Sequence, residues 1–439
     1  MMYVSLNELE KDIARASLKT NGIHTSILQK ELIDKLIYTA EFAEEDSIRT
    51  RAKQIIRDVA KKMHIIPSSI IDLYLGIGQG TVKQVCTVPA MNVRSLTYDF
   101  ARLVFRLIEK RSIGPVVFEI ARTEAAYTGQ HPDDFVVAIL AAAIKENYSG
   151  PVFMQADHMQ LSAKNYAADK NAEVESIKSF VKSFIDAGFY NIDIDASTLV
   201  DLNKPTRNEQ QYDNYIVTAE MTRYIRSLQP KNLQISIGAE IGHIGGKNSV
   251  PEDLVAFMQG YLKLHSTQEI GLSKIAIQTG SSHGGIPLPD GTVAKVAIDF
   301  EAIEKIGKLA RETYHMGGIV QHGASTLQKE LFHMFFEKKT LEIHLATEFQ
   351  NILYNNMPRD LKDRMYAWLN ENHQKEWDDT LTHEQNIYKT RKHAIGPFKK
   401  NLWELPENKK RVIISEWEKE LNFLFTKLHV DNTKSLLAQ

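Results

Sequence analysis

The sequence predicts an α/β fold, a closed barrel of eight parallel strands each followed by a helix, with added helical segments at both ends. From about residue 85, short apolar runs alternate with amphipathic stretches of helical length. This alternation requires parallel strands joined by crossover helices. Eight such units over roughly 265 residues match the size of a (β/α)8 barrel, also called a TIM barrel.

Composition is that of an ordinary globular protein and excludes several other classes. The chain has 439 residues, of which 43% are hydrophobic and 25% are charged, and its formal net charge is -2. Such a balance provides no general positive field for a nucleic acid or an anionic membrane. A single cysteine, Cys86, cannot form an internal disulfide.

The first part of the chain, residues 1–84, is predicted to be helical. Apolar residues recur at spacings of three and four over 8–19, 26–43 and 47–62. The first residues carry acidic side chains where a signal peptide would be cationic and then apolar, so we expect a cytoplasmic protein. The longest apolar run, 135–144, is too short to span a bilayer.

The barrel is predicted over residues 85–350 and a further helical segment over 351–439. A doubly wound sheet is set aside, because the early glycine-rich stretch at 76–80 lacks the context of a nucleotide-binding turn. Strands are expected at 85–93, 114–120, 150–155, 190–195, 233–241, 273–278, 317–322 and 340–346. Helices are expected at 98–110, 135–144, 173–188, 214–228, 251–258, 300–315, 325–338, 361–377 and 412–428.

Polar residues at the strand ends indicate an active site, because barrel enzymes carry theirs at the carboxyl ends of the strands. The third strand ends in Asp157 and His158, and the fifth in Glu240. His283 and His322 end the sixth and seventh strands. Three histidines from three strands are typical of a catalytic zinc site with one open position.

Two short loops after these histidines predict phosphate binding. Residues 281–285 read SSHGG and residues 322–326 read HGAST. Small residues in such turns can present backbone N–H groups and hydroxyls to an anion. The alternative is that these residues only make tight connections between strand and helix.

Several motifs together resemble the zinc-dependent class II ketose-bisphosphate aldolases. The resemblance covers about residues 85–350 and leaves out both helical ends. It is carried by VPAMNVRSL (88–96), ADH (156–158), DIDAS (193–197), AEIGHIGG (239–246), TGSSHGG (279–285) and QHGAS (321–325).

The resemblance implies a role for each matching position. Zinc would be held by His158, His283 and His322, with Glu240 as an alternative ligand, and Asp157 would serve as the acid/base at the C4 oxygen. The phosphate next to the ketone would be bound by Gly284, Gly323, Ser325 and Thr347. A monovalent cation near that phosphate is a further candidate cofactor. The partners implied are a small sugar phosphate and further copies of the chain in a homo-oligomer, with neither nucleic acid nor membrane.

The sequence departs from the family pattern in two places. The eighth strand ends in His344, Leu345, Ala346 and Thr347, where the family has Asn-x-Asp-Thr, so His344 stands where a substrate-binding residue is expected. In the loop after the fifth strand, Glu252 is either the base that moves a proton at the substrate or an N-terminal capping residue of the next helix.

These observations favour a zinc-dependent lyase that cleaves a phosphorylated ketose to dihydroxyacetone phosphate and an aldehyde. One alternative is a sugar epimerase on the same scaffold, and another is a non-catalytic accessory subunit of a tagatose-bisphosphate aldolase. Lys274 begins the sixth strand, away from the mouth, which argues against imine chemistry. His344 and Ala346 replace groups that would hold the distal hydroxyls, and no arginine can be assigned to a second phosphate. A ketose 1-phosphate, or a sugar with a different distal group, is therefore expected to be preferred over fructose 1,6-bisphosphate.

Overall fold

Eight parallel strands close into a barrel, as the sequence predicts. The computed structural model describes residues 2–17, 31–242, 247–265, 269–280, 297–324 and 327–438. Each barrel strand pairs with its neighbours in parallel, and pairing of β4 with β5 closes the ring. The barrel strands are β2 (Val88–Asn92), β3 (Val117–Ala121), β4 (Gly150–Gln160), β5 (Asn191–Asp195), β6 (Ser236–Glu240), β7 (Lys274–Ala276), β8 (Ile319–Gln321) and β9 (Glu342–Leu345).

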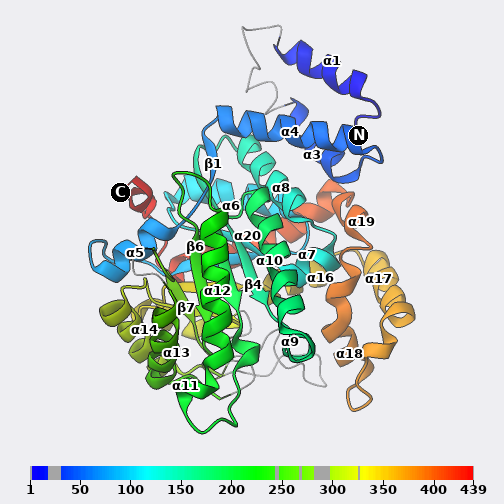
Figure 1. Cartoon of the computed structure of the whole chain (residues 1–439). Helices are drawn as coiled ribbons and strands as arrows, with labels where there is room; N and C mark the ends of the chain where they lie inside the picture. The colour runs from blue at the N-terminus through cyan, green and yellow to red at the C-terminus, as the bar shows by residue number, and fades with distance from the viewer. Residues whose placement is uncertain are drawn as a thin grey trace.

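Helices surround the barrel and bury their apolar faces against the strands (Figure 1). Those that follow the strands are α6 (Thr97–Arg111), α7 (Arg122–Thr128), α8 (Pro132–Lys145), α9 (Ala163–Ala168), α10 (Lys170–Ala187), α11 (Arg207–Gln210), α12 (Tyr212–Leu228), α13 (Pro251–Leu264), α14 (Phe300–Tyr314) and α16 (Thr347–Asn356). A 3-10 turn, η2 (Ser197–Leu199), follows β5. No helix in the described ranges is both long and apolar enough to cross a membrane.

The prediction of a single helix at 325–338 is wrong. The described part of this segment forms a 3-10 turn, η4 (Lys329–Leu331), and a short helix, α15 (His333–Glu337). Phe332, between these elements, and Phe335 are buried in the core. Packing of the two rings therefore outweighs the helical periodicity of the segment.

The expectation of helices alone before residue 85 is also wrong, because the segment contains a strand. β1 (Ile65–Ser68) pairs in parallel with the first residues of β4 at the amino end of the barrel. Its four residues are too few to show a period, and Pro67 suits an edge strand because it has no N–H to donate. Helix α5 (Ile71–Gln79) then closes this end of the barrel with apolar side chains.

The terminal segments pack onto the outside of the barrel and contact each other through Phe42 and Trp403 (Figure 1). Before β1 lie α1 (Leu6–Ser17), α3 (Ile33–Phe42) and α4 (Asp46–Lys62). After α16 lie α17 (Arg359–Asn372), η5 (Gln374–Glu376), α18 (His383–Thr390), η6 (Arg391–Ala394), α19 (Lys399–Trp403), α20 (Glu407–Lys427) and η7 (Lys434–Ala438). The barrel was expected to end at residue 350, which lies inside α16. The C-terminal segment packs on the barrel helices, because buried Trp417 of α20 contacts Phe100 of α6.

The interior of the barrel holds a buried network of charges instead of a fully apolar core. Lys274 Nζ is completely buried and lies 2.5 Å from Glu342 Oε1, 3.0 Å from Asp193 Oδ2 and 2.6 Å from Gln155 Oε1. Although burial opposes the charge, the Asp193 and Glu342 carboxylates raise the pKa of Lys274. The amine is therefore held as an ammonium ion and is unsuited to imine chemistry.

Removing this cation should destabilise the fold. In Lys274→Met two carboxylates stay buried without their counterion, which should lower the free energy of unfolding by about 3–5 kcal/mol. Urea unfolding followed by circular dichroism measures the change. Lys305→Met is the control, since Lys305 pairs with Glu301 on the exposed face of α14 and should show no measurable change. Equal stability of the two variants would contradict this account of the barrel interior.

Candidate functional site

An irregularity in β4 brings two neighbouring side chains to the same face. The pairing of β4 with β5 shifts register between Ala156 and Met159, so that β4 holds one extra residue there. His158 has a φ of 42°, in the left-handed region that non-glycine residues rarely occupy. Successive strand residues normally point to opposite faces. The bulge instead lets Asp157 and His158 both face the mouth of the barrel.

His158 and His322 lie beside each other at this mouth. Their ring centroids are 4.3 Å apart, and His158 Nε2 lies 3.8 Å from Asp157 Oδ1. His158 lies in β4 and His322 directly follows β8, so their approach depends on closure of the barrel. The structure thus brings Asp157 together with two of the three expected histidine ligands.

Two buried carboxylates contact the ring of His158. Its Nδ1 lies 2.8 Å from Glu240 Oε1 and 3.2 Å from Asp195 Oδ2. Glu240 Oε1 also lies 3.5 Å from His322 Nε2. Burial and the neighbouring Asp195 carboxylate raise the pKa of Glu240 to about 7. A carboxylate on one ring nitrogen orients an imidazole and directs its other nitrogen to a metal.

His344 joins the mouth to the charged interior of the barrel. Its Nδ1 lies 3.1 Å from Glu119 Oε2 and 3.2 Å from Asp157 Oδ1, and its Nε2 lies 2.7 Å from Glu342 Oε1. Although burial opposes the charge, Glu119 and Asp157 raise the pKa of His344. The ring therefore holds Asp157 in place and also lines the cavity.

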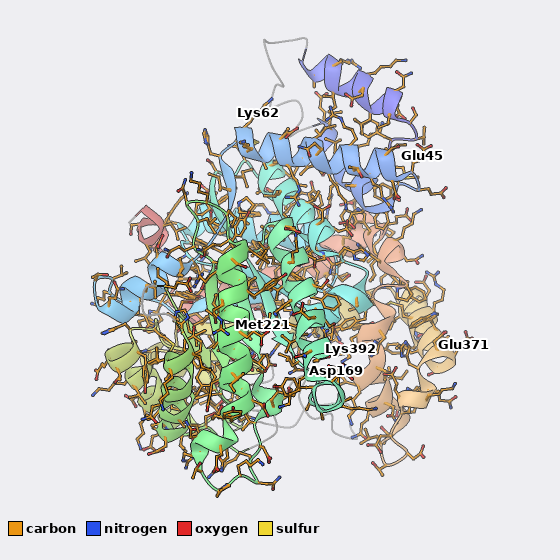
Figure 2. The ribbon with its side chains drawn as sticks, viewed as in Figure 1. Glu45, Lys62, Asp169, Met221, Glu371 and Lys392 are labelled. Carbon is orange, nitrogen blue, oxygen red and sulfur yellow. The ribbon has the colours of Figure 1, made fainter. Side chains whose placement is uncertain are left out.

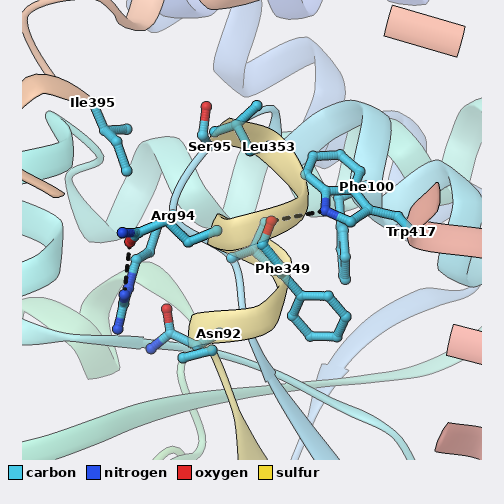
Figure 3. A pocket seen from close by; sticks show the side chains of 11 residues that line it. Asn92, Arg94, Ser95, Phe100, Phe349, Leu353, Ile395 and Trp417 are labelled. Atoms are coloured by element: carbon cyan, nitrogen blue, oxygen red, sulfur yellow. Dashed lines mark hydrogen bonds between the residues drawn. The ribbon is translucent and has the colours of Figure 1, made fainter. Parts of the chain in front are cut away.

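A cavity of about 550 Å³ opens over these residues, large enough for a small substrate. Asp157, His158, His322 and His344 line its floor. Arg94 lines one side, where its guanidinium lies 2.6 Å from Glu124 Oε1 and donates to Gln350. Figure 3 shows Arg94 in a smaller neighbouring pocket, which is also lined by Phe100 and Trp417. The polar mouth thus continues beyond the histidine cluster toward the rim.

Only some of the other expected site residues lie at the cavity. Gly323 and Thr347 line the cavity. Glu252 is exposed in the first turn of α13 and is not among the cavity residues, while Asp253 accepts the backbone N–H of Val250 in the capping position. His283, Gly284 and Ser325 lie outside the described residues.

Several residues of the mouth were not singled out from the sequence. Asp195 ends the fourth expected strand, within the DIDAS motif, and Glu119 is the last residue but one of the second expected strand. A charged residue near the end of a strand was therefore a usable signal for both. Arg94 follows Asn92 in the first motif. The cavity residues of the C-terminal segment, Tyr388, Lys389, Arg391 and Lys392, carried no such signal, because nothing local showed that this segment returns to the mouth.

The donor atoms of the mouth fit a divalent metal. Asp157, His158 and His322 each offer a ligand atom, and these atoms lie within 4.8 Å of one another. His158, Asp195 and Glu240 form a second such group. Imidazole and carboxylate donors suit zinc among the divalent ions. A separate group, His373, Glu376 and His393, lies in the C-terminal segment and is partly exposed.

Comparison with known proteins identifies related families and folds. A family model described as fructose-bisphosphate aldolase class-II matches residues 79–412, which extends past the expected end of the resemblance at 350. No match was found among curated proteins.

Solved structures also resemble the chain. A probable tagatose 6 phosphate kinase from Sinorhizobium meliloti 1021 is 12% identical with a TM-score of 0.56, covering 78% of this chain and 100% of that one. The fructuronate-tagaturonate epimerase UxaE from Cohnella laeviribosi is 11% identical with a TM-score of 0.53, covering 92% and 90%. A fructose-bisphosphate aldolase from Campylobacter jejuni is 18% identical with a TM-score of 0.47, covering 83% and 94%. The first two likenesses show a shared fold.

Zinc binding should depend on the two histidines that meet at the mouth. We expect one zinc per chain, and His158→Ala or His322→Ala should weaken its binding at least about tenfold, a loss seen even for outer partners of metal ligands. Competition with a chromogenic chelator measures the affinity. His333→Ala, on a partly exposed side of α15, is the control and should bind zinc as the wild type does. Wild-type affinity in both ligand variants would exclude this site.

Proposed function

The chain belongs to the class-II fructose-bisphosphate aldolase family, and we propose that it is a zinc-dependent lyase acting on a phosphorylated ketose. It cleaves the bond between C3 and C4 to give dihydroxyacetone phosphate and an aldehyde, and it catalyses the reverse addition. The observation that supports this most is the bulge of β4, which presents a carboxylate and an imidazole side by side at the mouth. Assembly as a homo-oligomer stays a prediction of the sequence.

Residues at the mouth of the barrel supply the ligands and the acid/base group. Zinc would be held by His158, His322 and His283, with Glu240 as an alternative ligand. When zinc is bound, it would act as a Lewis acid that polarises the ketone. A monovalent cation beside the phosphate loops belongs to the same proposal.

Asp157 is the group that moves the proton. In cleavage its carboxylate accepts the proton of the C4 hydroxyl, and in the reverse direction it returns that proton to the new hydroxyl. His344, 3.2 Å from Asp157 Oδ1, fixes the carboxylate on one side. Gly323, Thr347, Gly284 and Ser325 bind the phosphate next to the ketone, and Glu252 remains a candidate for proton transfer at C3.

The two alternative functions differ from a lyase in ways that can be observed. An accessory subunit would need no acid/base group in contact with the histidine cluster, and the buried Asp157 beside His158 therefore favours an enzyme. An epimerase would use the same groups without releasing a triose. Following triose release and epimer formation in the same reaction distinguishes the lyase from the epimerase.

Asp157 should be needed for turnover and not for zinc binding. Asp157→Asn should keep bound zinc and lower kcat by at least about a hundredfold, the usual effect of losing a general acid/base. Steady-state rates of triose phosphate release, with zinc content determined on the same samples, provide the measurement. Asp186→Asn, on the exposed surface of α10, is the matched control. An Asp157→Asn protein that cleaves at the wild-type rate would assign the proton transfer to another group.

A further inference from the structure

Two histidines and a glutamate meet in the C-terminal segment. His373 directly follows α17, Glu376 ends the turn η5, and His393 lies in η6. Figure 2 labels two residues close to them in sequence, Glu371 in α17 and Lys392 in η6. The described residues that line the cavity at the mouth include none of the three. The group is therefore separate from the zinc site proposed there.

The turn η5 places His373 and Glu376 on the same side of the chain. The backbone N–H of Glu376 donates to the carbonyl oxygen of His373 at 3.0 Å, which closes a 3-10 turn. Side chains three residues apart are eclipsed in such a turn. His373 Nδ1 and Glu376 Oε1 are accordingly 2.7 Å apart. The local sequence His-x-x-Glu thus forms a pair of donors by itself.

His393 approaches this pair from another part of the segment. Its Nε2 lies 3.5 Å from Glu376 Oε2, and its ring is stacked on that of His373 with 4.6 Å between centroids and 9° between planes. In a tetrahedral zinc site with bonds of about 2.0–2.1 Å, two ligand atoms lie about 3.3 Å apart. The two distances from the carboxylate to the imidazoles, 2.7 and 3.5 Å, bracket this separation.

Aromatic side chains hold both imidazoles in place. Trp368 of α17 packs against the ring of His373 with 5.2 Å between centroids. Tyr127 of α7 packs edge-on against His393 at 5.4 Å. The four rings form a continuous series from α17 to a helix of the barrel. Ligands that are already fixed in this way lose little freedom when a metal binds.

The charges of the group also suit a cation. The hydrogen bond with His373 lowers the pKa of Glu376, so its carboxylate is ionised. Burial and the adjacent Lys392 lower the pKa of His393, although Glu376 acts in the opposite direction. Two protonated rings stacked at 4.6 Å would repel each other, whereas neutral imidazoles have lone pairs that a metal can accept.

We propose that His373, Glu376 and His393 bind a second divalent metal ion, for which zinc suits the donors best, and that this ion fastens η5 to η6. η6 carries Arg391 and Lys392, which line one wall of the cavity at the mouth. The ion therefore stabilises the C-terminal wall of the cavity from outside. Its fourth position is left to water, because the described ranges bring only three donor groups together here.

This ion should bind more weakly than the zinc at the mouth. The side chain of Glu376 is 53% exposed, so water and salt screen its charge. The adjacent Lys392 repels a cation as well. The protein should therefore hold one zinc per chain, at the mouth, when zinc is scarce, and a second one when zinc is in excess.

Calorimetric titration of the full-length, chelator-treated protein with zinc chloride tests the site. The wild type should show two classes of binding, with one ion in each. His393→Ala or Glu376→Gln should weaken the second class at least about tenfold and leave the first unchanged, since even an outer partner of a metal ligand contributes that much. His383→Ala, which removes an exposed histidine of the same segment, is the matched control and should keep both classes.

The zinc site at the mouth can be removed separately, so that failure of one site is not mistaken for failure of the other. A protein with His158→Ala and His322→Ala should still bind one zinc with the affinity of the second class. If this protein is folded by circular dichroism and binds no zinc, the proposal is overturned. Zinc binding that neither His393→Ala nor Glu376→Gln weakens would overturn it too. Glu376→Gln keeps the shape of an exposed side chain, so it reports on the site even where His393→Ala does not fold.

Proteolysis tests whether the ion fastens η5. Lys375 is exposed within η5, and trypsin should cleave the wild type after it more slowly at excess zinc than at one equivalent. Rates are compared within each protein. Glu376→Gln should remove the protection by zinc, and His383→Ala should keep it. Equal rates at both zinc levels in the wild type would overturn the fastening of η5 to η6.

Discussion

The site depends on one extra residue in β4. Without the register shift between Ala156 and Met159, the alternation of the strand would turn either Asp157 or His158 away from the mouth. The left-handed backbone of His158 is unfavourable by itself and persists because the surroundings fix it. Asp195 and Glu240 fix the ring of His158, and His344 fixes the carboxylate of Asp157. Burial of these groups supports the strained backbone, and the strained backbone in turn places them at the mouth.

A continuous set of buried polar contacts connects this site to the opposite end of the barrel. The hydroxyl of Tyr74, on the helix that closes the amino end, donates to Glu342. Glu342 pairs with both Lys274 and His344, and His344 contacts Asp157. Buried charges need partners to be tolerated, so each member of this series restricts the next. The N-terminal helix α5 thus contributes to the geometry of a site that lies beyond its own reach.

Much of the fold follows from patterns within short stretches of the sequence. The alternation of apolar runs with helical stretches predicts the eight strands and their order, and strand-end position predicts the meeting of Asp157, His158 and His322. β1 was not predicted, because its four residues are too few to show the alternation of apolar and polar residues that indicates a strand. The segment around Phe332 and Phe335 was predicted as one helix because its periodicity is helical, but packing decides its conformation.

The unpredicted contacts of the site join residues that are far apart in the chain. Glu119 and His344 belong to different strands, and their pairing appears only when the barrel closes. Lys392 reaches the mouth because Gly396 permits close backbone contact with α7. Neither contact leaves a period or a motif. The sequence therefore indicated the chemistry of the floor of the cavity and gave no indication of its C-terminal wall.

The most direct measurement of the proposed chemistry is hydrogen exchange at C3 of dihydroxyacetone phosphate in D2O, without an aldehyde present. A class II lyase must remove a proton from this carbon before it can form a new bond there. Proton NMR should show that the zinc-loaded protein exchanges one of the two C3 hydrogens, and that chelation of the metal stops the exchange. Zinc-loaded protein that binds dihydroxyacetone phosphate and exchanges neither hydrogen would contradict the assignment of this barrel as an aldol-cleaving enzyme.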